Sequence, residues 1–545
     1  MGLGPVTVAQ AFAASAARFP AQPFLCVLAE TAANYGVPSG ETSYGAMQSR
    51  IESLRVAYAA AGYGHGHRVG LLLENRPDFF LHWFALNGLG VSVVPINADL
   101  RSAELEYLVG HSEIALAVAP SSRHAALCSA AHAAQRTLPV IDAADTPPPA
   151  PFAAPLAHML PNARSECALL YTSGTTGRPK GCMLPNRYYL HAGAWYAGIG
   201  GLARLRQGVE RMLTPLPLVH MNAMAYSTLA MVLTGGCLIA LDRFHPKTWW
   251  RSVRESRATV VHYLGVMPAL LMKAEAGAQD REHAVRFGFG AGVDRGLHAM
   301  FEARFGFPLL EAWAMTETGA GAVVIANQEP RRVGTSCFGR EGSDVEVKLV
   351  AEHGGTAGLD EPGELLVRHA GNDPRDGFFA GYLKDQAATD EAWAGGWFHT
   401  GDIVRRGADG QLHFIDRRKN VIRRSGENIS ALEVESVLLQ HPRVKAAAVA
   451  AVPDAVRGDE VLACIVGDGI AADADARRAA AADIVDWCLA RLAYYKAPGH
   501  VAFVDALPLT ASQKVQRGEL RTLAAALLGQ PHCIDTTAMK KRVSP

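Results

Sequence analysis

Short apolar runs alternate with longer amphipathic patterns through the first two thirds of the chain. Val8, Phe12 and Phe19 share one helical face, residues 69–73 form a short apolar run, and residues 79–89 return to a helical pattern. Strands that alternate with helices in this way pair through βαβ units. The pattern therefore predicts an α/β fold built on largely parallel sheets.

The pattern changes beyond residue 339. Residues 345–350 and 364–367 are short strand patterns between Gly-rich turns, and no long helix lies between them. This predicts a β-rich subdomain. A basic stretch follows, and then an α/β pattern returns, with helices expected at 431–440 and 472–492.

The basic stretch marks the expected domain boundary. We place it at Lys419, which divides the chain into an N-terminal domain, residues 1–418, and a C-terminal domain, residues 419–545. The segment after Leu528 is short and polar, so we expect it to fray.

Charge and cysteine content exclude several classes of protein. The 52 basic residues balance the 52 acidic ones, which argues against a general binder of nucleic acid or anionic membranes. The nine cysteines are scattered, and no two are spaced as CxxC, which indicates reduced thiols. The apolar stretch 226–241 is too short and too broken to span a membrane, and the N-terminus lacks the pattern of a signal peptide. We expect a cytoplasmic protein.

The stretch from residue 172 to residue 181 is dense in small polar residues and carries a lysine. Its Gly, Ser and Thr residues offer backbone N–H groups and hydroxyls to an oligophosphate, and the lysine adds positive charge. The spacing is not the GxxxxGK[ST] of a Walker A loop. By composition alone a flexible turn is the alternative. The candidate ATP-binding residues here are Thr172, Ser173, Gly174, Thr175, Thr176, Gly177 and Lys180.

This stretch, TSGTTGRPKG, resembles the signature of the adenylate-forming superfamily of acyl- and aryl-CoA synthetases, luciferases and peptide-synthetase adenylation domains. Five further motifs recur in the family's order. They are PLPLVH (215–220), EAWAMTETG (311–319), GWFHTGD (396–402), DRRKNVIRRSGENIS (416–430) and LTASQKVQRGEL (509–520). The resemblance implies a large N-terminal region of α/β and β-rich subdomains and a small, mobile α+β C-terminal domain.

The resemblance also implies an activity. ATP and a carboxylic acid give an acyl-adenylate and pyrophosphate, and the acyl group then passes to a thiol. The implied cofactors are ATP, Mg²⁺ and CoA as co-substrate. The chain most resembles bacterial ligases near crotonobetaine/carnitine-CoA ligase, with a role in fatty acid metabolism. An enzyme that loads a carrier-protein thiol is the alternative, and a non-catalytic nucleotide or acyl-CoA sensor is a further one. The resemblance is compatible with a homodimer.

Nucleotide-binding roles follow by motif position. Glu317 matches the Mg²⁺ ligand of the family, and Thr316 matches the threonine beside the α-phosphate. Trp313 stands where the family has an aromatic ring stacked near adenine, and a core residue is the alternative. Asp402 matches the acid that binds both ribose hydroxyls, and Arg417 the arginine beside ribose and phosphate.

The C-terminal motifs imply the second set of roles. Lys514 matches the lysine that bridges the carboxylate and the α-phosphate, although Gln513 replaces the usual preceding glycine. Lys419 matches the hinge about which the small domain rotates. The CoA arm is expected beside Ser425, Gly426 and Glu427. Three arginines of the basic stretch either meet CoA phosphates or belong to a solvated linker: Arg418, Arg423 and Arg424.

Three segments are expected to line the acid-binding pocket. His220 matches the residue that gates the carboxylate or the thiol. These segments contain no Lys or Arg that could bind a second carboxylate and no Asp placed to bind an amino group. This argues against an enzyme that activates amino acids. The pocket residues are Met221, Asn222, Met224, Gly265, Gly290, Ala291 and Gly292.

Overall fold

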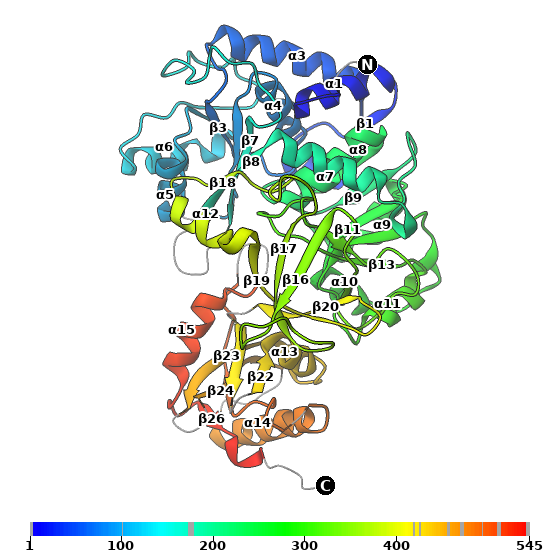
Figure 1. The fold of residues 1–545 in the computed structure, drawn as a ribbon, viewed down its shortest axis with the longest axis vertical. Coiled ribbons are helices and arrows are strands. Elements are labelled where there is room, and N and C mark those ends of the chain that lie inside the picture. Colours follow the sequence, from blue (N-terminus) through cyan, green and yellow to red (C-terminus); the bar gives the residue numbers. More distant parts are fainter. Residues whose placement is uncertain are drawn as a thin grey trace. The chain divides into compact units, whose positions relative to one another are not determined.

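The computed structural model describes residues 4–100, 102–172, 179–417, 420–424, 427–454, 458–468, 473–492, 494–509 and 514–540. The chain divides into two compact units (Figure 1). The first comprises Met1–Val347 and Leu366–His399, and the second Lys348–Leu365 and Thr400–Pro545. Lys419 and its neighbour 418 lie outside the described residues, so the boundary placed there stays a prediction.

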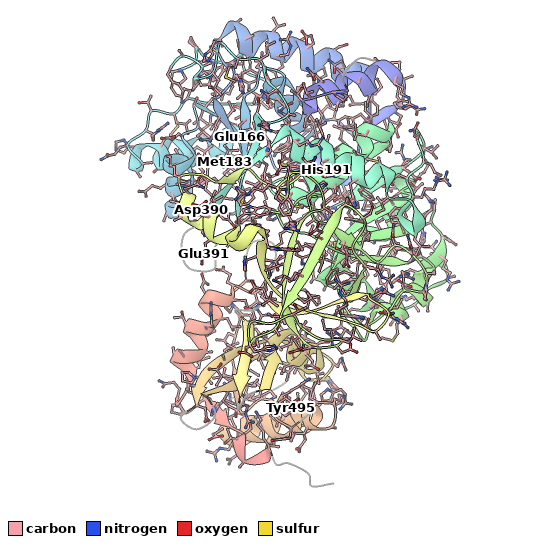
Figure 2. The ribbon with its side chains drawn as sticks, in the orientation of Figure 1. Glu166, Met183, His191, Asp390, Glu391 and Tyr495 are labelled. Carbon is pink, nitrogen blue, oxygen red and sulfur yellow. The ribbon has the colours of Figure 1, made fainter. Side chains whose placement is uncertain are left out.

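One sheet of the first unit has seven strands, and its central pairs are parallel. Met183, labelled in Figure 2, pairs with Leu169 on one side and with Gly381 on the other, both antiparallel. The strands, in spatial order, are β18 (Gly381–Tyr382), β8 (Lys180–Pro185), β7 (Glu166–Thr172), β4 (Ser92–Pro95), β3 (Arg68–Leu71), β5 (Leu116–Val118) and β6 (Val140–Ile141).

The other large sheet of this unit has eight strands, and its inner pairs are parallel as well. The α/β expectation is thereby confirmed. In spatial order the strands are β14 (Val324–Ile325), β13 (Leu309–Trp313), β12 (Phe287–Ala291), β11 (Val260–Leu264), β9 (Arg211–Thr214), β10 (Cys237–Ala240), β1 (Pro23–Val27) and β2 (Gly40–Ser43).

Helices α1, α3, α4, α7 and α8 contact one another beside these sheets (Figure 1). Helix α4 begins with Pro77 in its first turn, and its residues from Phe79 to Asn87 are all buried, as the apolar run at 79–89 predicts. The helices of this unit are α1 (Val8–Arg18), α2 (Ala29–Tyr35), α3 (Tyr44–Ala60), α4 (Pro77–Asn87), α5 (Ser102–Ser112), α6 (His124–Ala133), α7 (Asn186–Gly198), α8 (Leu229–Thr234), α9 (Trp249–Glu255), α10 (Val266–Met272), α11 (His298–Phe305) and α12 (Gln386–Ala392).

One helix and one further sheet carry residues predicted to have a function. Asn222–Thr228 form a π-helix, η3, which leads into α8. A five-stranded sheet contains the short strands expected at 345–350 and 364–367. Its strands, in spatial order, are β15 (Cys337–Gly339), β20 (Leu412–Arg417), β19 (Phe398–Arg406), β17 (Gly363–His369) and β16 (Val345–Val350).

The second unit packs helices on both faces of one sheet (Figure 1). Helices α13 (Ala431–Leu439) and α14 (Ala474–Leu489) share one apolar core with the sheet, and α15 (Arg517–Leu527) shares the other. Ser430 caps α13 by accepting from the Glu433 N–H. The sheet contains β22 (Glu427–Ser430), β21 (Val421–Arg424), β24 (Gly458–Gly467), β25 (His500–Phe503) and β26 (Cys533–Asp535), and β23 (Val444–Asp454) pairs with β24.

The expectation that the chain frays after Leu528 is wrong for residues 529–540. Strand β26 pairs with β25, and the Lys540 ammonium lies 2.5 Å from the buried carboxylate of Glu460. Residues 533–535 and Lys540 are therefore held by groups that lie far away in the sequence. Within the described residues, no helix is long and apolar enough to cross a membrane.

Candidate functional site

Parallel strands place most of the predicted residues of the first unit at one edge of the eight-stranded sheet. Strands β9, β11, β12 and β13 run parallel and end at Thr214, Leu264, Ala291 and Trp313. The last two residues of β12, Gly290 and Ala291, and the segments that follow these strands contain the predicted pocket residues and the MTETG motif. The carboxyl edge of a parallel sheet is where such folds bind ligands.

The turn after β13 is held tightly. The Thr318 hydroxyl accepts a hydrogen bond from the Met315 N–H at 2.9 Å, and the Tyr188 hydroxyl donates to the Thr316 carbonyl at 2.9 Å. Gly319 has a φ of 49°, and a Cβ there would lie 2.3 Å from the Tyr188 ring. A glycine is therefore required at this point of the motif.

Glu317 and Lys180 lie on two sides of the Tyr382 ring. The Tyr382 hydroxyl donates to Glu317 Oε1 at 2.9 Å, and the Lys180 ammonium lies 4.8 Å from the ring centroid. Burial, and then Glu317, raise the pKa of Tyr382 well above its usual range, so the phenol keeps its proton and remains a donor. Glu317 is only 8% exposed. Carboxylate, ammonium and phenol thus form one polar cluster.

The strand ladder explains this clustering. Thr172 is the Cα partner of Lys180 across β7 and β8, and Cys182 is the partner of Tyr382 across β8 and β18. The remaining predicted residues of the phosphate loop lie outside the described residues, namely Ser173, Gly174, Thr175, Thr176 and Gly177. Tyr382 could not be predicted from the sequence, because the pairing of β18 with β8 leaves no local signal.

The predicted pocket residues near β9 occupy the π-helix and the turn before it. His220 is exposed, whereas Met221 and Met224 are buried. Asn222 Oδ1 lies 2.9 Å from Nδ1 of His262, a fully buried imidazole. Burial lowers the pKa of His262 to about 3, so the ring is neutral and fixes the Asn222 side chain without adding charge.

The glycines at the ends of β11 and β12 are in backbone contact. A Cβ at Gly265 would lie 1.7 Å from the Gly292 carbonyl oxygen, and a Cβ at Gly290 would lie 2.3 Å from the Tyr263 carbonyl oxygen. Gly292 has a φ of 80°. Larger residues cannot occupy positions 265 and 290 without displacing a backbone. Ala291 is exposed beside them.

Trp313 ends β13 and is 6% exposed. Its ring packs against Phe338, with centroids 6.2 Å apart. The contact with Phe338 agrees with Trp313 as a core residue. Stacking of Trp313 on adenine stays a prediction.

In the second unit, Asp402 and Arg417 face each other across β19 and β20. Arg417 Nε lies 2.6 Å from Asp402 Oδ1, and Asp402 is 1% exposed. Lys514 reaches solvent, yet protein atoms crowd it: partial burial first, and then the charge of Arg417, lower the pKa of its ammonium. The acid and the two cations therefore belong to one electrostatic cluster.

The predicted hinge and CoA-binding residues are mostly outside the described residues. These are Lys419, Ser425 and Gly426, whereas Glu427 begins β22. Arg424 is described, and its Nε lies 2.7 Å from Glu460 Oε2 in a pair that is at most 5% exposed. A contact between Arg424 and CoA phosphates is therefore wrong, because this guanidinium is buried against a carboxylate.

Comparison with known proteins identifies related enzymes. The family model of the AMP-binding enzyme matches residues 12–383, and that of the AMP-binding enzyme C-terminal domain matches residues 433–514. A sulfoacetate–CoA ligase of Cupriavidus necator is 31% identical over 94% of this chain and 97% of that protein. A crotonobetaine/carnitine–CoA ligase of Shigella flexneri is 27% identical over 88% of this chain and 93% of its own length.

Solved structures share the fold. An o-succinylbenzoate CoA synthetase of Bacillus subtilis, in complex with its acyl-adenylate intermediate, has a TM-score of 0.77 and 24% identity, and the match covers 94% of this chain and 97% of that one. An anthranilate CoA ligase in complex with anthranoyl-AMP has a TM-score of 0.80 and 22% identity, with 96% and 99% covered. The expected fold class is confirmed.

Proposed function

Because the chain belongs to the AMP-binding enzyme family, we propose that it is an ATP-dependent ligase that joins a short carboxylic acid to CoA. The acid first reacts with ATP to give an acyl-adenylate and pyrophosphate. The acyl group then passes to the CoA thiol, and AMP leaves. The expectations of an AMP-forming acid–thiol ligase and of a member of the adenylate-forming superfamily are confirmed by relatives that are CoA ligases.

The observation that carries the proposal is the cluster of Glu317, Tyr382 and Lys180. Attack of a carboxylate on a phosphate is opposed by like charges, so the site has to neutralise the phosphates. Mg²⁺ is commonly bound by one or two carboxylates together with substrate phosphates. Glu317 fits as that one carboxylate, and the bound ion would neutralise negative charge on the phosphates. Lys180 would contribute a second positive charge beside the phosphates.

The other roles in the first unit are proposals based on motif position. Thr316 is assigned to the α-phosphate, Trp313 to adenine, and His220 to the gate of the acid or thiol. The phosphate loop is assigned to the triphosphate, including Thr172. The pocket is assigned to Met221, Asn222, Met224, Gly265, Gly290, Ala291 and Gly292.

The second unit is proposed to supply the remaining groups. Asp402 is assigned to the ribose hydroxyls, because a carboxylate can accept two O–H bonds, and Arg417, which pairs with that carboxylate, is assigned to the ribose and phosphate. Lys514 is assigned to the carboxylate and the α-phosphate during adenylation. Lys419 is assigned to the hinge of a mobile domain that begins there. Contact with CoA is assigned to Ser425, Gly426 and Glu427.

The acid is proposed to be short and polar. The two relatives found by sequence act on sulfoacetate and on crotonobetaine or carnitine, which are small acids with a second charged group, whereas the two solved structures are of enzymes named for o-succinylbenzoate and anthranilate. The first panel should therefore contain sulfonated, betaine-type and plain short acids.

Cytoplasmic location is proposed because all nine cysteines are free thiols, which is typical of proteins in a reducing compartment. Light scattering would test the expected homodimer.

The direct test is a mass-spectrometric product screen with ATP, Mg²⁺ and the acid panel, with and without CoA. Formation of acyl-CoA and AMP from one group of acids supports the proposal. Accumulation of acyl-AMP while free CoA stays unused would instead favour the carrier-protein alternative. The Lys514→Ala variant is the control for background hydrolysis of ATP.

A further inference from the structure

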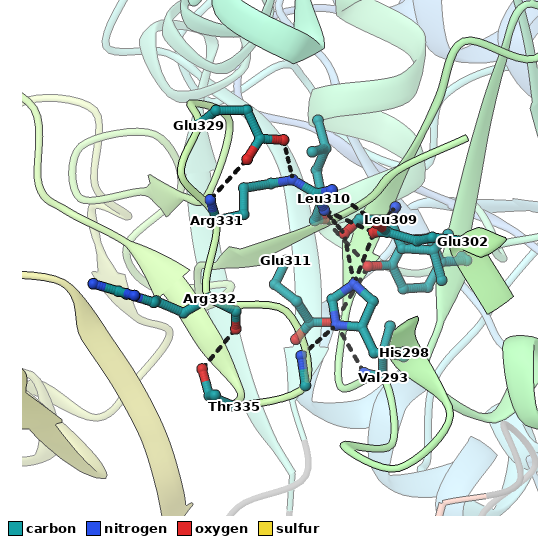
Figure 3. A network of polar contacts seen from close by, with 12 residues as sticks. Val293, His298, Glu302, Leu309, Leu310, Glu311, Glu329, Arg331, Arg332 and Thr335 are labelled. Carbon is teal, nitrogen blue, oxygen red and sulfur yellow. Dashed lines mark hydrogen bonds and ion pairs between the residues drawn. The ribbon is translucent and has the colours of Figure 1, made fainter. Parts of the chain in front are cut away.

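A buried glutamate holds the loop that follows β12. Glu311 lies within β13 and is 7% exposed. Its Oε1 accepts from the Val293 N–H at 2.9 Å (Figure 3), and its Oε2 accepts from the Gly292 N–H at 3.0 Å. The Tyr263 hydroxyl lies 3.2 Å from Glu311 Oε1 and 3.2 Å from the Leu310 carbonyl oxygen, so it donates to both acceptors of β13. One carboxylate therefore joins the ends of all three strands β11, β12 and β13.

The donors to Glu311 are neutral groups. Burial raises the pKa of Glu311, while the Val293 and Gly292 N–H groups, the charge of His298 and the Tyr263 hydroxyl oppose this rise. A buried charge without a bonded cation is costly unless its lone pairs are filled. Hydrogen bonds therefore stabilise the buried Glu311 carboxylate, and the two from backbone N–H groups come from the loop.

The loop itself has little freedom to move elsewhere. Gly292 is in the left-handed region, and its carbonyl oxygen lies where a Cβ of Gly265 would be. Glu311 holds the loop from one side while β11 limits it from the other. Strand β13, which contains Glu311, continues to Trp313 and then to the MTETG turn. The loop and that turn are therefore supported by the same strand.

A neighbouring glutamate provides a contrast. Glu302 accepts from the Leu309 N–H at 2.8 Å, and its Oε1 lies 2.7 Å from Arg331 Nη1 and 3.1 Å from His298 Nε2 (Figure 3). These bonds hold β13 to α11 and to Arg331, and none of them reaches Gly292 or Val293. Glu302 is less buried than Glu311 and is connected to different elements, so it is a control for the connection to the loop.

We propose that Glu311 is a positioning residue for acid specificity. It holds residues 290–293 in place as one wall of the acyl pocket and fixes the position of this wall relative to the MTETG turn. The inference rests on the proposed function for the role of the pocket. Glu311 is not a catalytic residue, since it acts through the backbone of the loop.

Glu311→Gln tests the proposal at nearly constant volume. The glutamine nitrogen is a donor and would face a backbone N–H, so at least one loop hydrogen bond is lost. Hydrogen exchange measured by mass spectrometry should speed up about tenfold or more in peptides that contain Gly292 and Val293, which corresponds to about 1.4 kcal/mol. Glu302→Gln should leave exchange there unchanged. Unchanged exchange in Glu311→Gln would overturn the assignment without any assay of activity.

Kinetics then test specificity. In Glu311→Gln the KM for the acid should rise about tenfold and the ranking of acids should change, while the KM for ATP stays within about twofold. Equal changes in both KM values, or the same change in Glu302→Gln, would overturn the specificity role. Tyr263→Phe removes one donor only and should change the acid KM in the same direction by less. It decides the matter if Glu311→Gln does not fold.

These readouts separate the two claims. If no acid of the panel gives product with the wild-type protein, the proposed function fails, and the exchange result still decides whether Glu311 holds the loop. If the wild type is active and Glu311→Gln matches it in both exchange and kinetics, the inference alone fails.

Discussion

Each unit buries a glutamate, and the two carboxylates are balanced differently: Glu311 begins the EAWAMTETG motif of the first unit, and Glu435 follows the 416–430 motif of the second. Glu311 of the first unit receives hydrogen bonds from two backbone N–H groups and a phenol. Glu435 of the second unit, 6% exposed, receives both ends of the Arg517 guanidinium at 2.6 and 2.7 Å, together with the Val449 N–H at 2.6 Å.

The two carboxylates differ in what happens when their charge or their partner is removed. Glu435 ties α13 and β23 to the first residue of α15, three residues after Lys514, so it supports the segment that carries this lysine. Removing Arg517 would leave the Glu435 carboxylate buried without its partner, and removing Glu435 would leave the Arg517 guanidinium half-buried without its partner. Glu311 has neutral partners, so a neutral side chain of the same size changes hydrogen-bond geometry without stranding a charge.

The largest effect is expected for Glu435→Gln. The free energy of unfolding should fall by about 3–5 kcal/mol, because Arg517, whose side chain is 16% exposed, keeps its charge without its carboxylate partner. Hydrogen exchange in α13 and β23 measures this loss. The double variant Glu435→Met with Arg517→Met should recover much of it. A loss no larger than that in Glu311→Gln would break the comparison.

Lys514→Ala should be next in size. Adenylate formation should slow about 10²–10³-fold, the scale for removal of one electrostatic group from a transition state. Thioester formation from supplied acyl-AMP should be spared. Single-turnover assays of each half-reaction measure both. Folded variants of Arg517 should show the same pattern in weaker form, since this residue supports the Lys514 segment. An equal loss in both half-reactions would refute the role of Lys514.

The pH dependence of adenylation should reveal the crowded lysine. The pKa of Lys514 is lowered, by burial first and Arg417 second, so the ammonium loses its proton at a lower pH than a free lysine. Adenylation should therefore decline as the pH rises through that lowered pKa. Lys514→Arg, whose guanidinium stays charged, should abolish the decline at whatever rate remains. A decline at the same pH in this variant would assign it to another group.

The smallest effect is expected for the stability of Glu311→Gln, a cost below about 1.5 kcal/mol. The pKa of Glu311 is raised, so the folded protein holds that proton more tightly than the unfolded chain. The wild type should therefore lose stability relative to the variant as the pH rises from the usual range of a glutamate through the raised value. Urea unfolding at several pH values tests the sign, and the opposite trend would contradict it.

Sequence patterns predicted the regular parts of this fold well. The runs at 69–73 and 79–89 became β3 and α4, because local hydrophobic periods and burial agree there. Lys540 was missed, because its partner Glu460 lies 80 positions away. Tyr382 and Glu311 were missed for a related reason. A charged or polar residue in a strand reveals its partners only when the neighbouring strands are known.

The π-helix at Asn222–Thr228 has an evolutionary consequence. A π-helix is wider than an α-helix and accommodates extra residues per turn, with bonds from residue i to i+5. Deletion of one residue within η3 would let the segment continue α8 with regular geometry. The side chains before the deletion, including Asn222, would then turn by about 100° relative to α8, the angle of one helical residue. A single codon lost or gained here would redirect the residues that we assign to the acid pocket, so substrate preference can diverge by a change in length as well as by substitution.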